Sequence, residues 1–464
     1  MLRMLRVTIY SVIFFYLLSA LFPMLKLDGL LSCLCFIIVT SSFFRVKRFV
    51  QVLGSIFLLL GIGLLWNSGV HWTQYILSFG PMLDLLTMFT LIPILGIPIK
   101  LGEYGKSIQA IIKKNITNSG HLYMFTSGIS YFFSIFMNLG TLPMTYYSVR
   151  PALDAFPKIE EKDRFMSRAI SRGFAMPLLW APVTPIVGIV ITMTGVSWVS
   201  ILPYVIPLSI LGMFLDWSIA TRKSKSIMNQ PDPTVANEIA ATVETVDTGR
   251  SGNVYQILLA ILLFTMTISI LDKVLSYPFL ITVSLLIIPF ALLWSLALKK
   301  GMEFGSQLKN HLQSFYITMK DQFFIFLATG FFISAINTSN ANEMVNGWTL
   351  SFIDSVGIQL FIVILPLIPL FLAFLGLHPA VSLVLMVEGI NLGTLGISPI
   401  LLTVAMLAGA VSSFLVGPYN ATIGLMSNLI KTSSYKVSNW NLSFALVYIA
   451  CVTVYLCILE FFLV

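Results

Sequence analysis

The stretch RGFAMPLLWAPVTPIVGI, Arg172 to Ile189, decides what kind of fold this chain adopts. It is apolar enough for a membrane helix, yet three prolines interrupt it. Proline removes one intrahelical hydrogen bond and obstructs another, and lipid cannot satisfy the backbone groups that this frees. Such a break is tolerated only inside protein or beside a wet cavity, so the stretch predicts a polytopic membrane protein with a functional interior.

The composition supports this interpretation over the whole chain. Of the 464 residues, 57% are hydrophobic and 10% are charged, and apolar runs of about twenty residues recur from end to end. The formal net charge of +8 is explained by basic cytoplasmic loops rather than by a nucleic-acid partner, and Arg172 is interpreted as one such positive-inside anchor. The four cysteines lie in apolar runs without histidines or carboxylates at ligand spacing, so we expect neither a zinc site nor a cofactor.

The apolar runs predict an all-α fold of about eleven transmembrane helices plus two re-entrant hairpins. The first run is long for a signal peptide and is interpreted as an uncleaved helix within residues 1–27. The spans that stand out are expected at about 7–24, 28–44, 49–66, 73–98, 168–195, 199–220, 254–271, 276–298, 315–338 and 441–462.

Residues 118–149 are expected to form a hairpin that enters the membrane from the cytoplasm and returns. They lie between two basic stretches, 100–114 and 150–172, which a single crossing would place on opposite sides of the membrane. Two full crossings need about forty residues, more than the segment offers. The hairpin therefore turns at membrane depth, near Asn138 to Pro143.

A polar linker, residues 221–252, separates two halves, 28–220 and 253–464, that repeat weakly. The sequence LGTLP ending at Pro143 aligns with LGLHP ending at Pro379, an offset of 379 − 143 = 236. The same offset pairs Gly173 with Gly409, Pro182 with Pro418, and Gly188 with Gly424.

The second half is expected to contain the other hairpin, at about 350–396. Its connection to the next span is nearly uncharged, whereas that of the first hairpin is basic, so the two hairpins are expected to open to opposite sides. The repeat is therefore inverted. The charges also predict a multi-pass protein of the plasma membrane with a cytoplasmic N-terminus.

The hairpin tips and broken helices hold the candidate site, because paired interruptions in two halves point to a transport site. Helix N-termini there favour an anion, and freed carbonyls or hydroxyls favour a cation. The candidate substrate or ion ligands are Asn138, Thr141, Thr184, His378, Asn420 and Thr422. The candidate helix breaks are Pro143, Pro182, Pro185, Pro379 and Pro418. The sequence does not identify a metal; one option is a sodium site near Asn138 and Asn420.

Structural roles compete with these assignments. Asn138 and Thr141 also suit caps of the returning helix, and each proline suits a simple kink. His378 either hydrogen-bonds a carbonyl or carries a proton within the membrane. Asp84 and Glu388 are further intramembrane candidates for titration.

The motifs resemble those of the ion transporter superfamily, whose branches include divalent anion sodium symporters and citrate carriers. The resemblance rests on NLGTLP, APVTP, LGLHP and GPYNAT and covers the architecture from about residue 28 onward. It implies inverted repeats, substrate held between hairpin tips and helix breaks, and a homodimer. The chain departs from the symporters' Ser-Asn-Thr signature at both tips, so the coupling ion is either sodium or a proton.

The sequence thus predicts a cation-coupled secondary active transporter that moves a small, carboxylate-like anion by alternating access. Its partners are then the solute and membrane lipid, and the chain is not an enzyme. No phosphate-binding loop of the pattern GxxxxGK[ST] occurs. A second hypothesis keeps the fold and changes the cargo to a lipid-linked or amphipathic compound. A third is an intramembrane transferase that uses His378.

Overall fold

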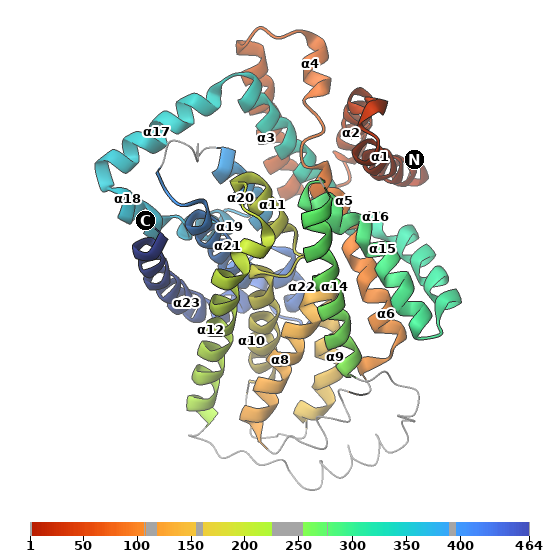
Figure 1. Ribbon diagram of the computed structural model, residues 1–464, viewed down its shortest axis with the longest axis vertical. Coiled ribbons are helices and arrows are strands. Elements are labelled where there is room, and N and C mark those ends of the chain that lie inside the picture. Colours follow the sequence, from red (N-terminus) through yellow and green to blue (C-terminus); the bar gives the residue numbers. More distant parts are fainter. Residues whose placement is uncertain are drawn as a thin grey trace.

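The computed structural model describes residues 2–105, 107, 118–154, 161–224, 254–275, 277–388 and 396–463 (Figure 1). Within these ranges the secondary structure is helical, apart from one isolated bridge between Gly80 and Met82. Nine helical segments of the described residues, some of them made of consecutive helices, are long and apolar enough to cross a membrane, or ten when one bent pair counts as a span. The prediction of an all-α polytopic membrane protein is confirmed.

The first half of the chain contains eleven described α-helices and four short 3-10 turns. The helices are α1 (Leu2–Leu21), α2 (Asp28–Ser42), α3 (Arg48–Asn67), α4 (Trp72–Leu77), α5 (Leu83–Leu91), α6 (Gly96–Leu101), α8 (Ser119–Met137), α9 (Thr141–Asp154), α10 (Lys162–Ala175), α11 (Pro185–Thr194) and α12 (Trp198–Ser224). The turns are η1 (Pro23–Leu25), η2 (Ile92–Leu95), η3 (Asn138–Gly140) and η4 (Met176–Leu179).

The second half is made of ten described α-helices. They are α14 (Val254–Val274), α15 (Phe279–Ala297), α16 (Gly301–Thr338), α17 (Ala341–Val356), α18 (Ile358–Ile364), α19 (Leu367–Phe374), α20 (Pro379–Glu388), α21 (Pro399–Val416), α22 (Ala421–Leu429) and α23 (Ser434–Leu463).

Several expected spans are interrupted in the structure. The span expected at 73–98 consists of α4, α5, η2 and α6, with a turn at Met82 whose φ is +77°. The span expected at 168–195 consists of α10 and α11, separated by η4 and a non-helical turn. Helices α2 and α11 are apolar but shorter than a full crossing. The interrupted segment Leu83–Leu101 still has the length and hydropathy of a crossing, whereas Leu5–Leu21 in α1 is a further apolar helix that is shorter.

The described helices pack in two groups. In the outer group, α1–α6 and α14–α17, α3 runs along α16 while α15 packs on α5 and α6. In the hairpin group, α8–α12 and α18–α23, α10 packs on α8, and α21 packs on both α19 and α23. The groups meet where η2 contacts η3, where α11 contacts α15, and where α16 contacts α20.

The first expected hairpin is formed by α8 and α9. The two helices are in contact, and in Figure 1 α8 begins and α9 ends toward the lower edge. Asn118 caps the first of them, because its side-chain oxygen accepts the N–H of His121 at 2.8 Å. At the tip, Asn138 has a φ of +46°, a conformation that asparagine tolerates better than most residues.

The second hairpin is formed by α18 and α19 on one side and α20 on the other. Its tip needs a glycine, because Gly376 has a φ of +92° and a Cβ there would overlap the ring of Phe49. Helix α17 meets α18 at 114°, so the entering arm begins at Ile358. The end of the segment expected at 350–396 includes residues 389–395, which lie outside the described residues.

Helices of the hairpin group begin at positions that keep the offset of 236 found in the sequence. Helix α11 begins at Pro185 and α22 at Ala421, while α12 begins at Trp198 and α23 at Ser434. The offset therefore relates helix boundaries as well as isolated glycines and prolines.

Two paired glycines occupy similar surroundings. A Cβ on Gly173 of α10 would overlap the backbone carbonyl of Ser127 on the neighbouring α8. A Cβ on Gly409 of α21 would likewise overlap the carbonyl of Pro366, which precedes α19. In each half, glycine therefore lets the helix that follows the hairpin approach the hairpin's own backbone closely.

Candidate functional site

A cavity of about 870 Å³ lies where the two groups meet. Its wall is formed by η2 and α6, by the first hairpin tip with α9, by α16, and by the second tip with the start of α22. Among the expected site residues it brings together Asn138 and Pro143 of the first tip and His378 of the second. Ala421, directly after the second helix break, also lines it.

Three helices begin at this cavity. Helix α9 starts at Thr141, directly after the tip residues Asn138 to Gly140 in the wall, and α22 starts at Ala421. Helix α20 starts at Pro379, next to His378. Helix N-termini carry partial positive charge and unpaired N–H groups, so the arrangement favours a negatively charged or acceptor-rich ligand.

The ring of His378 is held by contacts from several helices. Its Nδ1 accepts the backbone N–H of Ala380 at 3.2 Å, which caps α20. Phe89, Phe326 and Phe414 approach the ring edge-on, with centroid distances of 5.4 to 5.8 Å. This places an oriented imidazole in the cavity wall.

The other expected ligands lie behind the wall. Thr141, Thr184, Asn420 and Thr422 are all buried and do not line the cavity. In the first break, the neighbouring helix α12 supplies donors to two carbonyls: Trp198 Nε1 donates to the carbonyl of Trp180 at 2.9 Å, and the Ser209 hydroxyl donates to that of Met176 at 2.9 Å. Pro182 lies within this turn, and Pro185 is the first residue of α11.

Asn420 organises the second break, the turn around Pro418. Its side-chain oxygen accepts the N–H of Ile423 at 2.9 Å and so caps α22. Its amide nitrogen donates to the carbonyls of Ser413 at 2.9 Å and Phe414 at 3.2 Å, which end α21. One buried side chain therefore joins both helix ends across the break.

Asn420→Ala is expected to lower the free energy of unfolding by about 1–3 kcal/mol, because a helix cap is lost and two buried carbonyls lose their donor. Asn420→Ser is the matched control, because serine keeps an N-cap acceptor and loses the donor to the two carbonyls without adding a charge. Thermal unfolding of the purified variants measures both. An alanine variant as stable as the parent protein would show that the break does not depend on Asn420.

Buried hydroxyls without partners gather on three helices that contact one another, α9, α10 and α22. None of the following side chains has a hydrogen-bond partner among the described residues: Thr141, Thr145, Ser167, Ser171 and Thr422. An unpaired buried hydroxyl costs free energy unless it finds a partner, so these helices offer oxygen atoms that a bound ion or water could use.

The sequence interpretation missed a polar face of α16. Gln307, Asn310, His311, Ser314 and Gln322 all line the cavity. The first four have the spacing i, i+3, i+4 and i+7 that places residues on one helix face, so the pattern was visible in the sequence. The expected span began only at residue 315, whereas α16 begins at Gly301 and includes them.

Of the two carboxylate candidates, the structure describes only the side chain of Asp84. Asp84 lies in the first turn of α5, where its Oδ1 accepts the N–H of Leu85 at 2.7 Å, and it does not line the cavity. A carboxylate in this position is stabilised by the helix N-terminus. Glu388 ends α20, and its side chain lies outside the described residues.

Interpreting Arg172 as a surface anchor was wrong. Its side chain is 3% exposed and donates from Nη1 to Oδ1 of Asp216 at 2.8 Å. Its Nε donates to Asn441 Oδ1 at 3.1 Å, and its guanidinium carbon lies 4.6 Å from the centre of the Phe444 ring. A buried arginine requires such a partner, because an unpaired charge is costly away from water.

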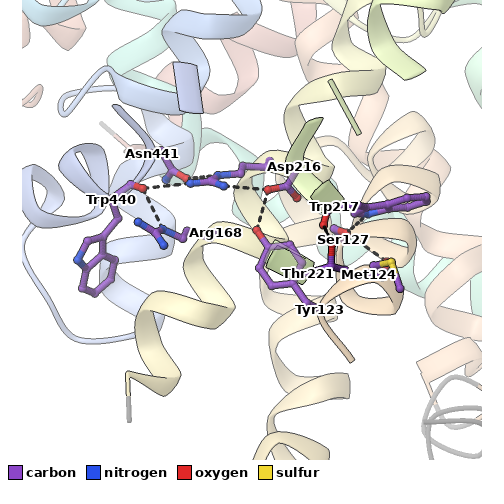
Figure 2. A network of polar contacts seen from close by, with 10 residues as sticks. Tyr123, Met124, Ser127, Arg168, Asp216, Trp217, Thr221, Trp440 and Asn441 are labelled. Carbon is purple, nitrogen blue, oxygen red and sulfur yellow. Dashed lines mark hydrogen bonds and ion pairs between the residues drawn. The ribbon is translucent and has the colours of Figure 1, made fainter. Parts of the chain in front are cut away.

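Figure 2 shows how this network connects helices of the hairpin group. Asp216 accepts a hydrogen bond from the hydroxyl of Tyr123 at 2.9 Å and one from Arg172, whose guanidinium lies between Asp216 and Asn441. Arg168 donates to the backbone carbonyl of Trp440 at 3.0 Å. The network thus joins α8, α10, α12 and α23, and it lies apart from the residues that line the cavity.

Comparison with solved structures places this architecture among transporter folds. The YdaH transporter of Alcanivorax borkumensis, described as having an unusual topology, matches with a TM-score of 0.55 and 13% identity over 87% of this chain and 97% of that one. MtrF of Neisseria gonorrhoeae, described within a class of antimetabolite efflux pumps, matches with a TM-score of 0.58 and 14% identity over 89% and 98%. No protein-family model and no curated protein sequence matches. At these identities the likeness shows the fold, and the resemblance to the ion transporter superfamily stays a prediction.

Proposed function

We propose that this chain is a secondary active transporter that holds its solute in the cavity between the hairpin tips. The observation that carries the proposal is that both tips and the second broken helix reach one cavity, although they are far apart in the sequence. Discontinuous helices that meet at membrane depth are the usual site of substrate binding in such transporters. The fold shared with YdaH and MtrF supports the same function.

The proposed solute is a small, carboxylate-like anion. Three helix N-termini begin at the cavity, and their partial positive charge favours an anion. Lys100, at the end of α6, also lines the wall and supplies a full positive charge.

A second candidate solute is a lipid-linked or amphipathic compound. The volume of about 870 Å³ is in the range that accommodates drug-sized ligands and exceeds what a small carboxylate fills. Part of the wall is apolar, with Met137, Leu139 and Met144 near the first tip and Ile97 on α6. An amphipathic solute would place its acceptor group at the helix N-termini and its apolar body against these residues.

The proposed mechanism is alternating access with an inverted repeat. The constant offset between helix starts and the matched packing of Gly173 and Gly409 support two equivalent halves. The basic and uncharged connections after the two hairpins support opposite orientations. Movement of the hairpin group against the outer group would then expose the cavity to each side in turn.

Coupling to sodium or to protons is also proposed. The unpartnered hydroxyl of Thr141 directly follows the first tip, and that of Thr422 lies in the first turn of α22, just after the second break. Hydroxyl oxygens of this kind suit a hard cation. A sodium site near Asn138 and Asn420 would use them together with freed carbonyls. The plasma-membrane location, the cytoplasmic N-terminus and the homodimer remain predictions from the charges and the resemblance.

A ligand screen by thermal unfolding tests the anion. Acetate, succinate, citrate and phosphate are each added with and without sodium, and a ligand at a hundred times its dissociation constant stabilises the folded state by about 2.7 kcal/mol. We expect at least one anion to raise the melting temperature. Lys100→Gln is expected to lower the affinity for that anion several-fold. Lys309→Gln, on the exposed side of α16, is expected to leave this affinity unchanged. Stabilisation by none of the anions, with the protein folded, would contradict an anionic solute.

A further inference from the structure

We propose that His378 binds the solute as a neutral imidazole, donating a hydrogen bond from Nε2–H to an acceptor oxygen, and that it carries no proton through the transport cycle. The inference rests on the proposed function, because it takes the cavity as the solute site. It goes further by assigning one atom of the protein to one kind of atom in the ligand.

The tautomer follows from the capping contact. Pro379 is the first residue of α20 and has no N–H, so Ala380 provides the first backbone donor of that helix. Its N–H points to Nδ1 of His378 at 3.2 Å. A backbone N–H can only donate, so Nδ1 must present its lone pair, and the single ring proton of the neutral imidazole lies on Nε2.

A second proton on the ring is opposed by its surroundings. It would have to sit on Nδ1, where it would face the N–H of Ala380 and abolish the cap. The positive charge would also lie at the N-terminus of α20, the end of a helix that disfavours cations. Three phenylalanine rings, from α5, α16 and α21, contact the imidazole edge-on and offer no counter-charge to a second ring proton.

No described carboxylate compensates such a charge. The titratable residues that share the cavity wall with His378 are Lys100, Glu103, Tyr104, Tyr147 and His311. Those on the helices around the ring are Asp84 on α5 and Glu303, Lys309, Tyr316, Lys320 and Asp321 on α16. Among the described residues, none of these side chains forms a hydrogen bond or ion pair with His378; Asp321, for example, pairs with Lys47 at 3.9 Å.

The remaining ring nitrogen is available to a ligand. Nε2 has no hydrogen-bond partner among the described residues, and it does not belong to the buried polar atoms that lack a partner. His378 lines the cavity, so this nitrogen is the ring's point of contact with a solute. The neutral Nε2–H donates equally to a carboxylate oxygen or an amide oxygen, and proton coupling would require a different group.

The tautomer is tested by solid-state NMR of ¹⁵N-histidine-labelled protein in lipid between pH 5.5 and 8. The chain has only four histidines, so the His378 resonances are identified by their loss in His378→Asn. We expect a neutral ring with the proton on Nε2 throughout this range. A ring that gains a second proton between pH 8 and 5.5, or that carries its proton on Nδ1, would overturn the inference.

The ligand contact is tested with the same four anions, acetate, succinate, citrate and phosphate. His378→Asn is the informative variant, because asparagine keeps an N-cap acceptor for α20 and lacks the Nε2–H. We expect unchanged thermal stability without ligand, an affinity about tenfold lower for the anion that binds, and a shift of the wild-type Nε2 resonance on binding. An anion that binds without moving this resonance and equally well to His378→Asn would refute the contact and leave the proposed function intact. Binding of none of the anions would instead refute the proposed anion site.

Discussion

Arg172→Leu is expected to lower the free energy of unfolding by about 3–5 kcal/mol, because it leaves the carboxylate of Asp216 buried without its counter-charge. The loss is large because the pair lies at 2.8 Å with both side chains inside the hairpin group. Thermal unfolding and the folded yield in lipid or detergent measure it. The double variant Arg172→Leu with Asp216→Leu is expected to recover most of the stability, because it removes both buried charges together.

Arg164→Leu on the same helix is the matched control. Arg164 forms an ion pair with Glu161 near the surface, where side chains are 34% and 59% exposed. Exposed pairs contribute about 0–1 kcal/mol, so this change is expected to have little effect. If Arg172→Leu were as mild as Arg164→Leu, or if the double variant were no better than the single one, the buried network would not be what joins these helices.

Gly173→Ala is expected to cost about 1–3 kcal/mol, because its new methyl group would overlap the carbonyl of Ser127 and push α10 away from α8. Gly409→Ala is expected to do the same against Pro366 in the second half. Backbone overlap cannot be relieved by a side-chain rotation, so the helices themselves must move. Thermal unfolding of both variants measures the effect.

Gly128→Ala provides the control for this prediction. It lies within α8, and a Cβ there meets nothing within 4 Å. Alanine has the higher helix propensity by about 1 kcal/mol, so the control is expected to be neutral or slightly stabilising. Equal stability of the Gly173→Ala and Gly128→Ala variants would rule out close helix approach as the reason for glycine at position 173.

Proline and glycine made the hairpins and breaks predictable from the sequence. The first tip at Asn138 to Gly140 and the break before Pro185 lie where the glycine and proline residues predict them. The cavity was predictable only in part. Its tip residues follow from the motifs, whereas most of the polar face of α16 lies before residue 315, where the sequence predicts no membrane span.

The environment of Arg172 could not be predicted in this way. Its partner Asp216 is 44 residues away and on a different helix, so no local spacing connects the two. The same holds for Asn420, whose amide is used to join two helix ends rather than to face the cavity. Polar residues near a break therefore indicate where the helix is interrupted, and they do not by themselves identify what the site binds.

Cysteine protection tests whether the solute occupies the cavity between the hairpin tips. In a variant with its four cysteines replaced by serine, a single cysteine replaces either Ser314, which lines the cavity, or Ser306, which is exposed on the same helix outside it. The rate of maleimide labelling is measured with and without the anion that stabilises the protein. We predict that this anion slows labelling at position 314 and leaves position 306 unchanged. Equal labelling of position 314 with and without a saturating stabilising anion would contradict it.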